Sequence, residues 1–155
     1  MKEDIFHKGF RSTLAIHEAC HLLAYQIMCP DAKFLSIYVD DKDGYLEIDQ
    51  NTIETRENML KLMLSGFIGC GIMRLGWKKK IKEADLVDFL SMGAGNGDWM
   101  MLRRDYSLNM EEALRISNEI STWFSSRENR RFVRKVAKKL ILSQTPLKYE
   151  DTNLI

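Results

Sequence analysis

The chain has 155 residues, the length of one ordinary domain, and its 45% hydrophobic and 29% charged residues argue against a largely disordered protein. The net charge of +1 provides no overall attraction to nucleic acid or to an anionic membrane. Only 2 prolines and 9 glycines occur, which disfavours a many-turned β-sandwich and favours helices.

The first predicted helix covers residues 12–28, where apolar residues recur at helical spacing. Ser12 or Thr13 is the expected N-cap, because a side-chain hydroxyl can accept a hydrogen bond from a free backbone N–H of the first turn. The pair Pro30-Asp31 then breaks the chain. The sequence therefore predicts a long helix that ends near Met28.

Two short segments after this helix have the composition of β-strands. Residues 34–39 are rich in aromatic and β-branched side chains, and residues 45–48 alternate between apolar and polar side chains. Turn-forming residues lie between them at 40–44. We therefore expect a β-hairpin.

A second helix is expected from about Asn51 to Leu75, with Glu54 as its capping-box partner and Gly76 at its end. Its middle is apolar on nearly every side, which indicates a buried helix. Small residues there would let another element approach closely, namely Ser65, Gly66, Gly69 and Gly71.

Three further helices are predicted in the second half of the chain. A short one covers residues 83–92, and two longer ones follow the expected caps Asn109 and Ser125. Residues 93–97 are expected to form a glycine-rich loop, and Trp99-Met100-Met101 to lie in the core. The predicted fold is a single α+β domain over residues 1–155, mainly α with a small β-hairpin.

The cysteine content and the apolar segments suggest where the protein works. Three cysteines without a C-x-x-C pair argue against a disulfide framework and for a reducing compartment. No apolar leader follows Met1, and the most apolar stretch, residues 62–73, is shorter than the about 20 residues that span a bilayer. We expect a cytoplasmic protein without a transmembrane segment.

Residues 17–21 read His-Glu-Ala-Cys-His, an H-E-x-x-H motif inside the first predicted helix. Residues four apart lie on one helical face, so the imidazoles of His17 and His21 can reach one ion. Zn²⁺ favours neutral histidine nitrogens and keeps a position for water in catalytic sites. Glu18 could take the proton of that water as general base. Two ordinary helix histidines are the alternative interpretation.

A zinc site of this kind needs a third protein ligand, which the motif does not identify. His7 lies upstream, and four downstream carboxylates are candidates: Glu83, Asp85, Asp88 and Asp98. In a zinc peptidase of a different family, Glu54 or Glu57 would take this place. Composition alone does not choose among these residues.

Residues 13–24, Thr-Leu-Ala-Ile-His-Glu-Ala-Cys-His-Leu-Leu-Ala, resemble the peptidase domain of the FtsH family of zinc proteases, whose motif reads H-E-A-G-H. The likeness continues through the hairpin with its Gly44-Tyr45 pair, the glycine-rich helix and the Gly-Ala-Gly-Asn-Gly-Asp segment at 93–98. The aspartate of that family's G-A-S-N-D segment is its third zinc ligand. The resemblance therefore implies an FtsH-type zincin fold, endopeptidase activity and Asp98 as the third ligand.

The sequence departs from the family's pattern at three places. Cys20 replaces the glycine of the motif and could act as an unintended soft ligand. Gly97 is an extra residue before Asp98. The family's acidic pair and arginine in the buried helix are absent, which leaves the oligomeric state open.

A polypeptide is the expected substrate, held in an extended form by an edge strand. The residues expected to bind it are Phe34, Leu35, Ser36, Ile37, Tyr38 and Val39. The sequence contains no P-loop motif G-x-x-x-x-G-K-[ST], so a separate ATPase or unfoldase would have to open folded substrates. The alternative function is a peptidase-like binding or regulatory domain without activity, against which the intact Glu18 argues.

Cationic residues recur on the last long helix, at Arg127, Arg130, Arg131, Arg134, Lys135, Lys138 and Lys139. This pattern is most simply a solvated outer face, because charged outer faces are usual on amphipathic helices. An acidic partner that docks there is the sharper alternative, and nucleic acid is not expected.

Overall fold

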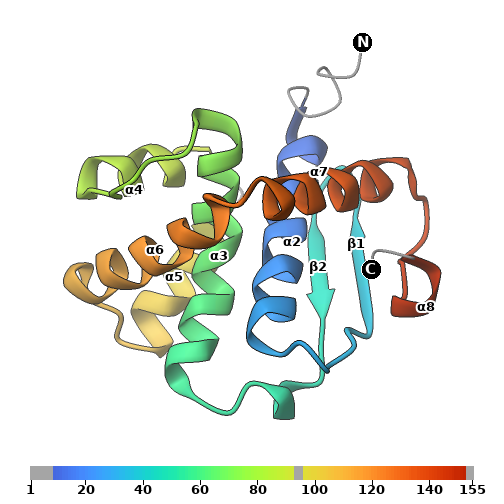
Figure 1. Ribbon diagram of the computed structural model, residues 1–155, viewed down its shortest axis with the longest axis horizontal. Helices are drawn as coiled ribbons and strands as arrows, with labels where there is room; N and C mark the ends of the chain where they lie inside the picture. Colours follow the sequence, from blue (N-terminus) through green and yellow to red (C-terminus); the bar gives the residue numbers. More distant parts are fainter. Residues whose placement is uncertain (1–8, 93–95, 153–155) are drawn as a thin grey trace.

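The structure is a computed structural model that describes residues 9–92 and 96–152. It confirms a mainly helical α+β architecture with one two-stranded antiparallel sheet (Figure 1). Its elements in chain order are α2 (Gly9–Met28), β1 (Ser36–Val39), β2 (Gly44–Glu47), the 3₁₀ turn η1 (Gln50–Thr52), α3 (Arg56–Leu75), α4 (Glu83–Leu90), α5 (Asn96–Asp105), α6 (Met110–Phe124), α7 (Arg127–Leu142) and α8 (Tyr149–Thr152).

Helices α2 and α3 lie side by side and antiparallel at the centre of the molecule (Figure 1). Their antiparallel order follows from two contacts. Cys70 on α3 donates to the carbonyl of Thr13 near the start of α2, whereas His21 farther along α2 contacts the carbonyl of Leu62. Helix α7 packs on α2, and α6 packs on α3, so the two central helices are buried from both sides.

Two helix starts differ from the expected ones. Helix α2 already includes Gly9, so Ser12 and Thr13 are buried inside it and do not cap it. Helix α3 begins at Arg56 because Thr55 caps it by accepting a hydrogen bond from the N–H of Asn58. The expected start near Asn51 was wrong, since that residue belongs to the separate turn η1.

Other helix ends agree with the sequence more closely. Asn109 caps α6 by accepting a hydrogen bond from the N–H of Glu112, as predicted. Gly76 ends α3 with φ +104°, a backbone conformation that favours glycine. Helix α7 is capped by Ser126 rather than Ser125, because two adjacent serines offer the same hydroxyl.

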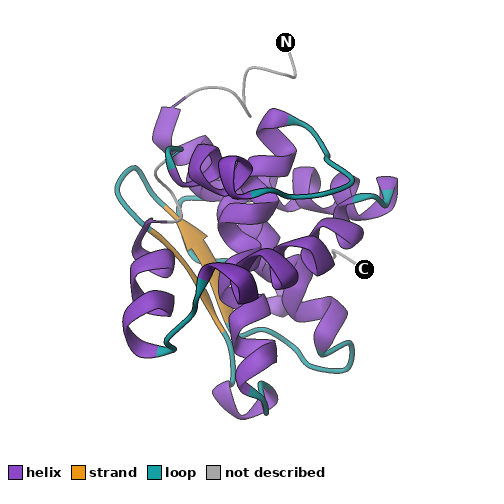
Figure 2. Ribbon diagram, turned by 90° about the vertical axis from the view of Figure 1, so that its left-hand side faces the viewer, coloured by secondary structure: helices purple, strands orange, loops and turns teal. Residues whose placement is uncertain are grey.

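The predicted hairpin is present, and the two strands form a narrow ribbon among the helices (Figure 2). Ile37 pairs with Leu46 in the register, but its N–H and C=O both bond to Leu147, each at 2.9 Å. Ile37 and Leu46 therefore form a non-hydrogen-bonded pair of the antiparallel ladder, in which the N–H and C=O of both residues point away from the partner strand. Leu46 accordingly directs its N–H and C=O away from β1. Within the described chain, no strand pairs with this outer edge of β2.

Helix α5 begins inside the segment that was expected to be a loop. Asn96 and Gly97 are helical, and the rest of the expected loop, residues 93–95, lies outside the described residues. Trp99 packs edge-on against Phe67, as a core residue would. The expectation was wrong for the two methionines, because 67% of Met100 and 40% of Met101 are exposed. None of the described helices combines the length and the hydropathy needed to cross a membrane.

Candidate metal centre

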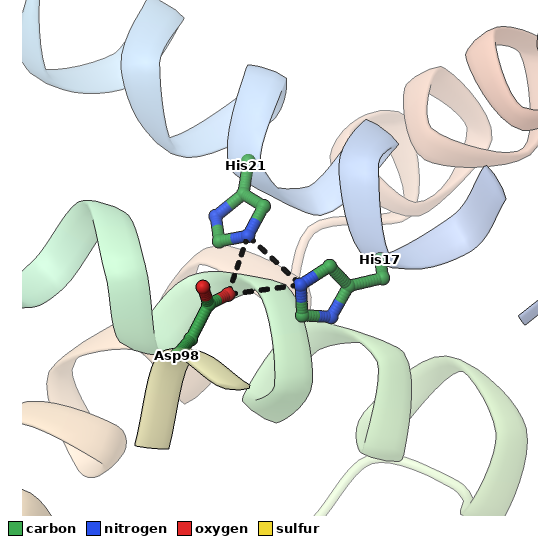
Figure 3. A group of neighbouring side chains, drawn as sticks. All are labelled: His17, His21 and Asp98. Atoms are coloured by element: carbon green, nitrogen blue, oxygen red, sulfur yellow. Dashed lines mark hydrogen bonds and ion pairs between the residues drawn. The ribbon is translucent and has the colours of Figure 1, made fainter. Parts of the chain in front are cut away.

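Three potential metal ligands from two helices converge at one point (Figure 3). His17 and His21 lie one turn apart on α2, and Asp98 lies in the first turn of α5. The Asp98 Oδ2 atom is 3.0 Å from Nε2 of His17 and 3.1 Å from Nε2 of His21. The two Nε2 atoms are 3.0 Å apart.

These three distances fit a small tetrahedral ion. Ligand atoms bound at 2.0–2.1 Å around such an ion lie about 3.3 Å apart, so the observed triangle is within a few tenths of an ångström of that size. The donor set also fits, because two imidazole nitrogens and one carboxylate oxygen are typical zinc ligands. All three residues also line one cleft.

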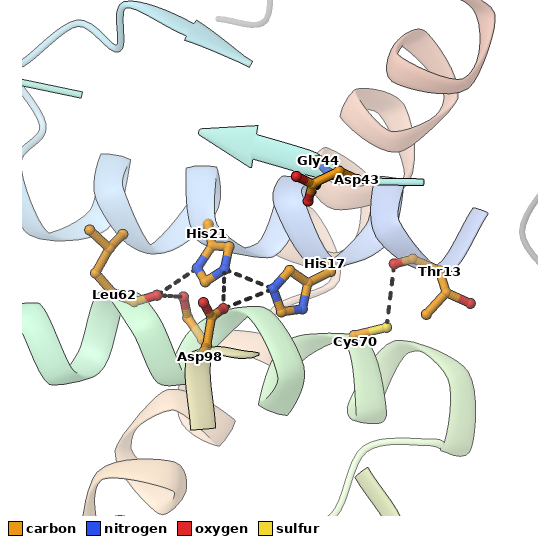
Figure 4. A network of polar contacts seen from close by, with 9 residues as sticks. Thr13, His17, His21, Asp43, Gly44, Leu62, Cys70 and Asp98 are labelled. Carbon is orange, nitrogen blue, oxygen red and sulfur yellow. Dashed lines mark hydrogen bonds and ion pairs between the residues drawn. The ribbon is translucent and has the colours of Figure 1, made fainter. Parts of the chain in front are cut away.

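A hydrogen bond to the backbone fixes the orientation of His21. Its Nδ1 lies 2.7 Å from the carbonyl oxygen of Leu62 (Figure 4). The same oxygen also accepts a hydrogen bond from the hydroxyl of Ser65. A carbonyl only accepts, so Nδ1 donates, and Nε2 of the neutral ring keeps its lone pair for a metal. This is the outer-shell contact that metal-binding histidines usually make.

Gly66 of α3 forms the floor beneath both imidazoles. A Cβ atom at this position would lie 2.4 Å from Nε2 of His21 and 2.6 Å from Cε1 of His17. No side chain larger than hydrogen fits there without moving the rings. The sequence predicted a close approach along this helix, but it did not indicate that the histidines make it.

Glu18 is a buried carboxylate without a partner. Only 6% of it is exposed, it lines the cleft, and it makes no hydrogen bond or ion pair in the described part of the chain. Burial raises the pKa of its carboxyl to about 7. A carboxylate that serves the fold is normally paired when it is buried this deeply, so Glu18 has the character of a functional group.

The three ligand side chains shift one another's pKa values. Burial raises the pKa of Asp98, but hydrogen bonds with the two histidines outweigh this and hold it well below its usual range. Burial and the nearby His21 lower the pKa of His17. For His21 burial also lowers the pKa, but hydrogen bonds with Asp98 and the Leu62 carbonyl, together with the nearby charges of Glu18 and Asp98, outweigh it and raise the pKa to about 9. Asp98 is therefore ionised, as a metal ligand must be.

The other proposed third ligands lie elsewhere. Glu57 pairs with Arg115 at 2.7 Å, and Asp85 accepts from Lys78 and from the N–H of Lys82. Three more carboxylates are exposed away from the histidines, namely Glu54, Glu83 and Asp88, and His7 lies outside the described residues. Among the described candidates, Asp98 is the one that meets the histidines.

Cys20 does not join the converging atoms. A Cβ at Gly69 would lie 2.6 Å from the Cys20 sulfur, so the thiol packs against the backbone of α3 away from the ligand triangle. Burial raises the pKa of this thiol well above its usual value. A protonated thiol in such a place behaves as a small apolar side chain.

A cleft of about 540 Å³ opens over the three ligands and Glu18. Its end next to Glu18 is polar and is formed by residues 42–44 of the hairpin, of which Figure 4 shows Asp43 and Gly44. At its other end, toward the start of α3, the side chains that line it are mostly apolar: Ile48, Met59, Met63, Met101 and Tyr106.

The predicted substrate-binding segment does not border this cleft. None of residues 34–39 lines it, whereas Gly44, Tyr45 and Leu46 of β2 do. Strand β1 lies between β2 and Leu147, which leaves β2 as the edge. A role of residues 34–39 in substrate binding remains a prediction, but the geometry favours β2.

Comparisons with protein-family models, with curated proteins and with solved structures each found no match to this chain. The resemblance to the FtsH family therefore stays a prediction from sequence motifs. The assignment of the site rests on the geometry of the residues themselves.

Proposed function

We propose that this protein is a zinc-dependent endopeptidase that hydrolyses peptide bonds in unfolded or flexible polypeptides. One observation carries the proposal: a buried carboxylate without a partner, Glu18, stands beside three converging ligand atoms at the floor of an open cleft. A purely structural cluster has no need of the unpaired carboxylate, and it has no need of the cleft.

His17, His21 and Asp98 would hold the zinc ion, since their donor atoms fit its size and its ligand preference. When bound, zinc supplies Lewis-acid activation of water and of the scissile carbonyl. Glu18 accepts the proton of the attacking water and returns it to the departing amine. The Leu62 carbonyl holds the His21 ring in the orientation that metal binding requires.

The outer edge of β2 would hold the substrate in an extended form. Leu46 directs its N–H and C=O to this edge and lines the cleft, so an added strand could form main-chain hydrogen bonds there. Gly44 lies against Glu18, and because it has no side chain, strand β2 can come close to Glu18. Pairing of this kind recognises the backbone, so preference for particular sequences should be broad.

The apolar end of the cleft would take one substrate side chain. Met59, Met63 and Met101 contribute flexible, polarisable side chains that can adapt to differently shaped apolar groups. Leucine, methionine or phenylalanine next to the scissile bond should therefore be favoured over charged residues. The alternative function, a peptidase-like binding domain without activity, would retain this groove but would not require Glu18.

The decisive experiment compares one protein substrate in its native and in its reduced, unfolded form under identical conditions. Opening a folded domain costs about 5–15 kcal/mol, and the chain has no P-loop to supply that work. We expect cleavage of the unfolded form, an intact native form, and no cleavage of either by Glu18→Gln. Equal cleavage of both forms that is absent in Glu18→Gln would contradict the proposed substrate class.

A further inference from the structure

One side of α7 consists of five cations and one leucine. At 100° per residue, six positions fall within an arc of about 100°, and all are exposed: Arg127, Arg131, Arg134, Lys135, Lys138 and Leu142. The opposite side packs on α2 through buried apolar residues. Of the seven cations noted in the sequence, Arg130 lies off this arc and donates to the carbonyls of Phe124 and Ser125.

The charge on this face is not compensated. Helix α7 contains seven cations and one glutamate, a charge of +6, whereas the whole chain has +1 and the remainder therefore −5. Several cations elsewhere are paired, as Lys61 is with Glu119 and Arg115 with Glu57. None of the five cations on the arc forms an ion pair within the described residues. The small net charge of the chain conceals this asymmetry.

Leu142 indicates what kind of anionic partner fits. It is 69% exposed, more than any other large hydrophobic side chain that the structure describes, and it lies on the same arc as the cations. Nucleic-acid phosphates offer a leucine no favourable contact. The surface of an anionic bilayer offers both phosphate groups for the cations and an apolar region beneath them.

We propose that the outer face of α7 docks on an anionic phospholipid surface. The five cations contact the headgroups along about 16 Å of helix, and Leu142 points toward the acyl chains. Helix α7 crosses the outside of α2 (Figure 1), and none of its residues lines the cleft. Docking of this face therefore leaves the cleft open, and it does not depend on the proposed peptidase activity.

The test measures binding of the full chain to vesicles of phosphatidylcholine with and without phosphatidylserine. Binding should require the anionic lipid and should weaken as salt is raised. Each cation near such a surface raises the partition coefficient of the protein onto the vesicles about fivefold. Lys135→Gln combined with Lys138→Gln should weaken binding about 30-fold. The matched control, Lys79→Gln with Lys80→Gln, removes the same charge from exposed lysines elsewhere and should have no effect.

A third variant tests the apolar part of the contact. Leu142→Ser leaves the charge unchanged and should reduce several-fold the binding that remains at high salt. Equal losses from the two lysine pairs, or equal binding to neutral vesicles, would overturn the proposal. The proposal would also be overturned if the protein bound a nucleic-acid duplex more tightly than the anionic vesicles and if Leu142→Ser bound the vesicles as well as the wild type does.

Discussion

Replacement of Gly66 by alanine is expected to disable the metal centre while the fold survives. The added Cβ would lie 2.4 Å from Nε2 of His21 and 2.6 Å from Cε1 of His17. Carbon contacts are favourable only from about 3.5 Å, so both rings would have to move by about 1 Å. Metal–ligand distances tolerate about 0.2 Å. We therefore expect the zinc affinity to fall by about 10- to 100-fold.

The same substitution should change the stability of the metal-free protein much less. Alanine gains about 1 kcal/mol over glycine inside a helix, whereas overpacking costs about 1–3 kcal/mol. The free energy of unfolding should therefore fall by about 0–2 kcal/mol. Urea unfolding of the metal-free protein measures this change, and competition with a chromogenic chelator measures the zinc affinity.

Two other glycines provide matched controls. A Cβ at Gly97, directly before Asp98, would meet nothing within 4 Å, so Gly97→Ala should keep the zinc affinity. A Cβ at Gly71 would lie 2.2 Å from Cδ1 of Phe89, away from the histidines, so Gly71→Ala should lower stability alone. Wild-type zinc affinity in Gly66→Ala would refute the reasoning. An equal loss in Gly71→Ala would show that general packing was disturbed instead.

Three further predictions concern the ligand, the cleft and the thiols. Asp98→Ala should weaken zinc binding at least 100-fold in a chelator competition. Asp85→Ala should keep the zinc affinity but lower the free energy of unfolding by about 0.5–2 kcal/mol, because it removes a helix cap. A larger loss of zinc affinity in Asp85→Ala than in Asp98→Ala would mean that the ligand assignment is wrong. Met101→Lys should lower kcat/KM about tenfold for peptides with a large apolar residue at the cleaved bond. The same substitution at the exposed neighbouring residue, Met100→Lys, should leave kcat/KM unchanged. Equal effects of the two substitutions would rule out the apolar subsite. In native protein only Cys29 should react quickly with a thiol reagent, because Cys20 and Cys70 are buried and shielded from it, whereas Cys29 is partly exposed; three fast thiols would contradict this packing.

Local patterns predicted the elements of the fold well. The helix that contains His17 and His21, the hairpin and the glycine-rich helix all follow from periodicity and turn chemistry within short windows. Helix starts were less certain, because adjacent residues such as Ser125 and Ser126 offer the same capping group. The exposure of Met100 and Met101 was missed because apolar composition does not distinguish a core from an exposed surface or, for Met101, from the lining of a cleft.

Contacts between distant residues were beyond these patterns. Asp98 is 77 residues from His21, and only a family resemblance selected it among the carboxylates. The exposed edge of the hairpin depends on Leu147, which covers β1 from the far end of the chain. The support that Gly66 gives to the histidines depends on how two helices cross. Each of these facts belongs to the tertiary structure, which periodicity does not encode.

The most direct test of the proposed zinc peptidase compares Glu18→Gln with the wild type at equal zinc content. The substitution keeps the size of the side chain and leaves the donor atoms of His17, His21 and Asp98 unchanged. We predict about one zinc per chain in both proteins, and a loss of unfolded-substrate hydrolysis of about 10²–10⁴-fold in the variant. Equal hydrolysis by the two proteins, or equal inactivity on every unfolded substrate tried, would contradict the role assigned to Glu18.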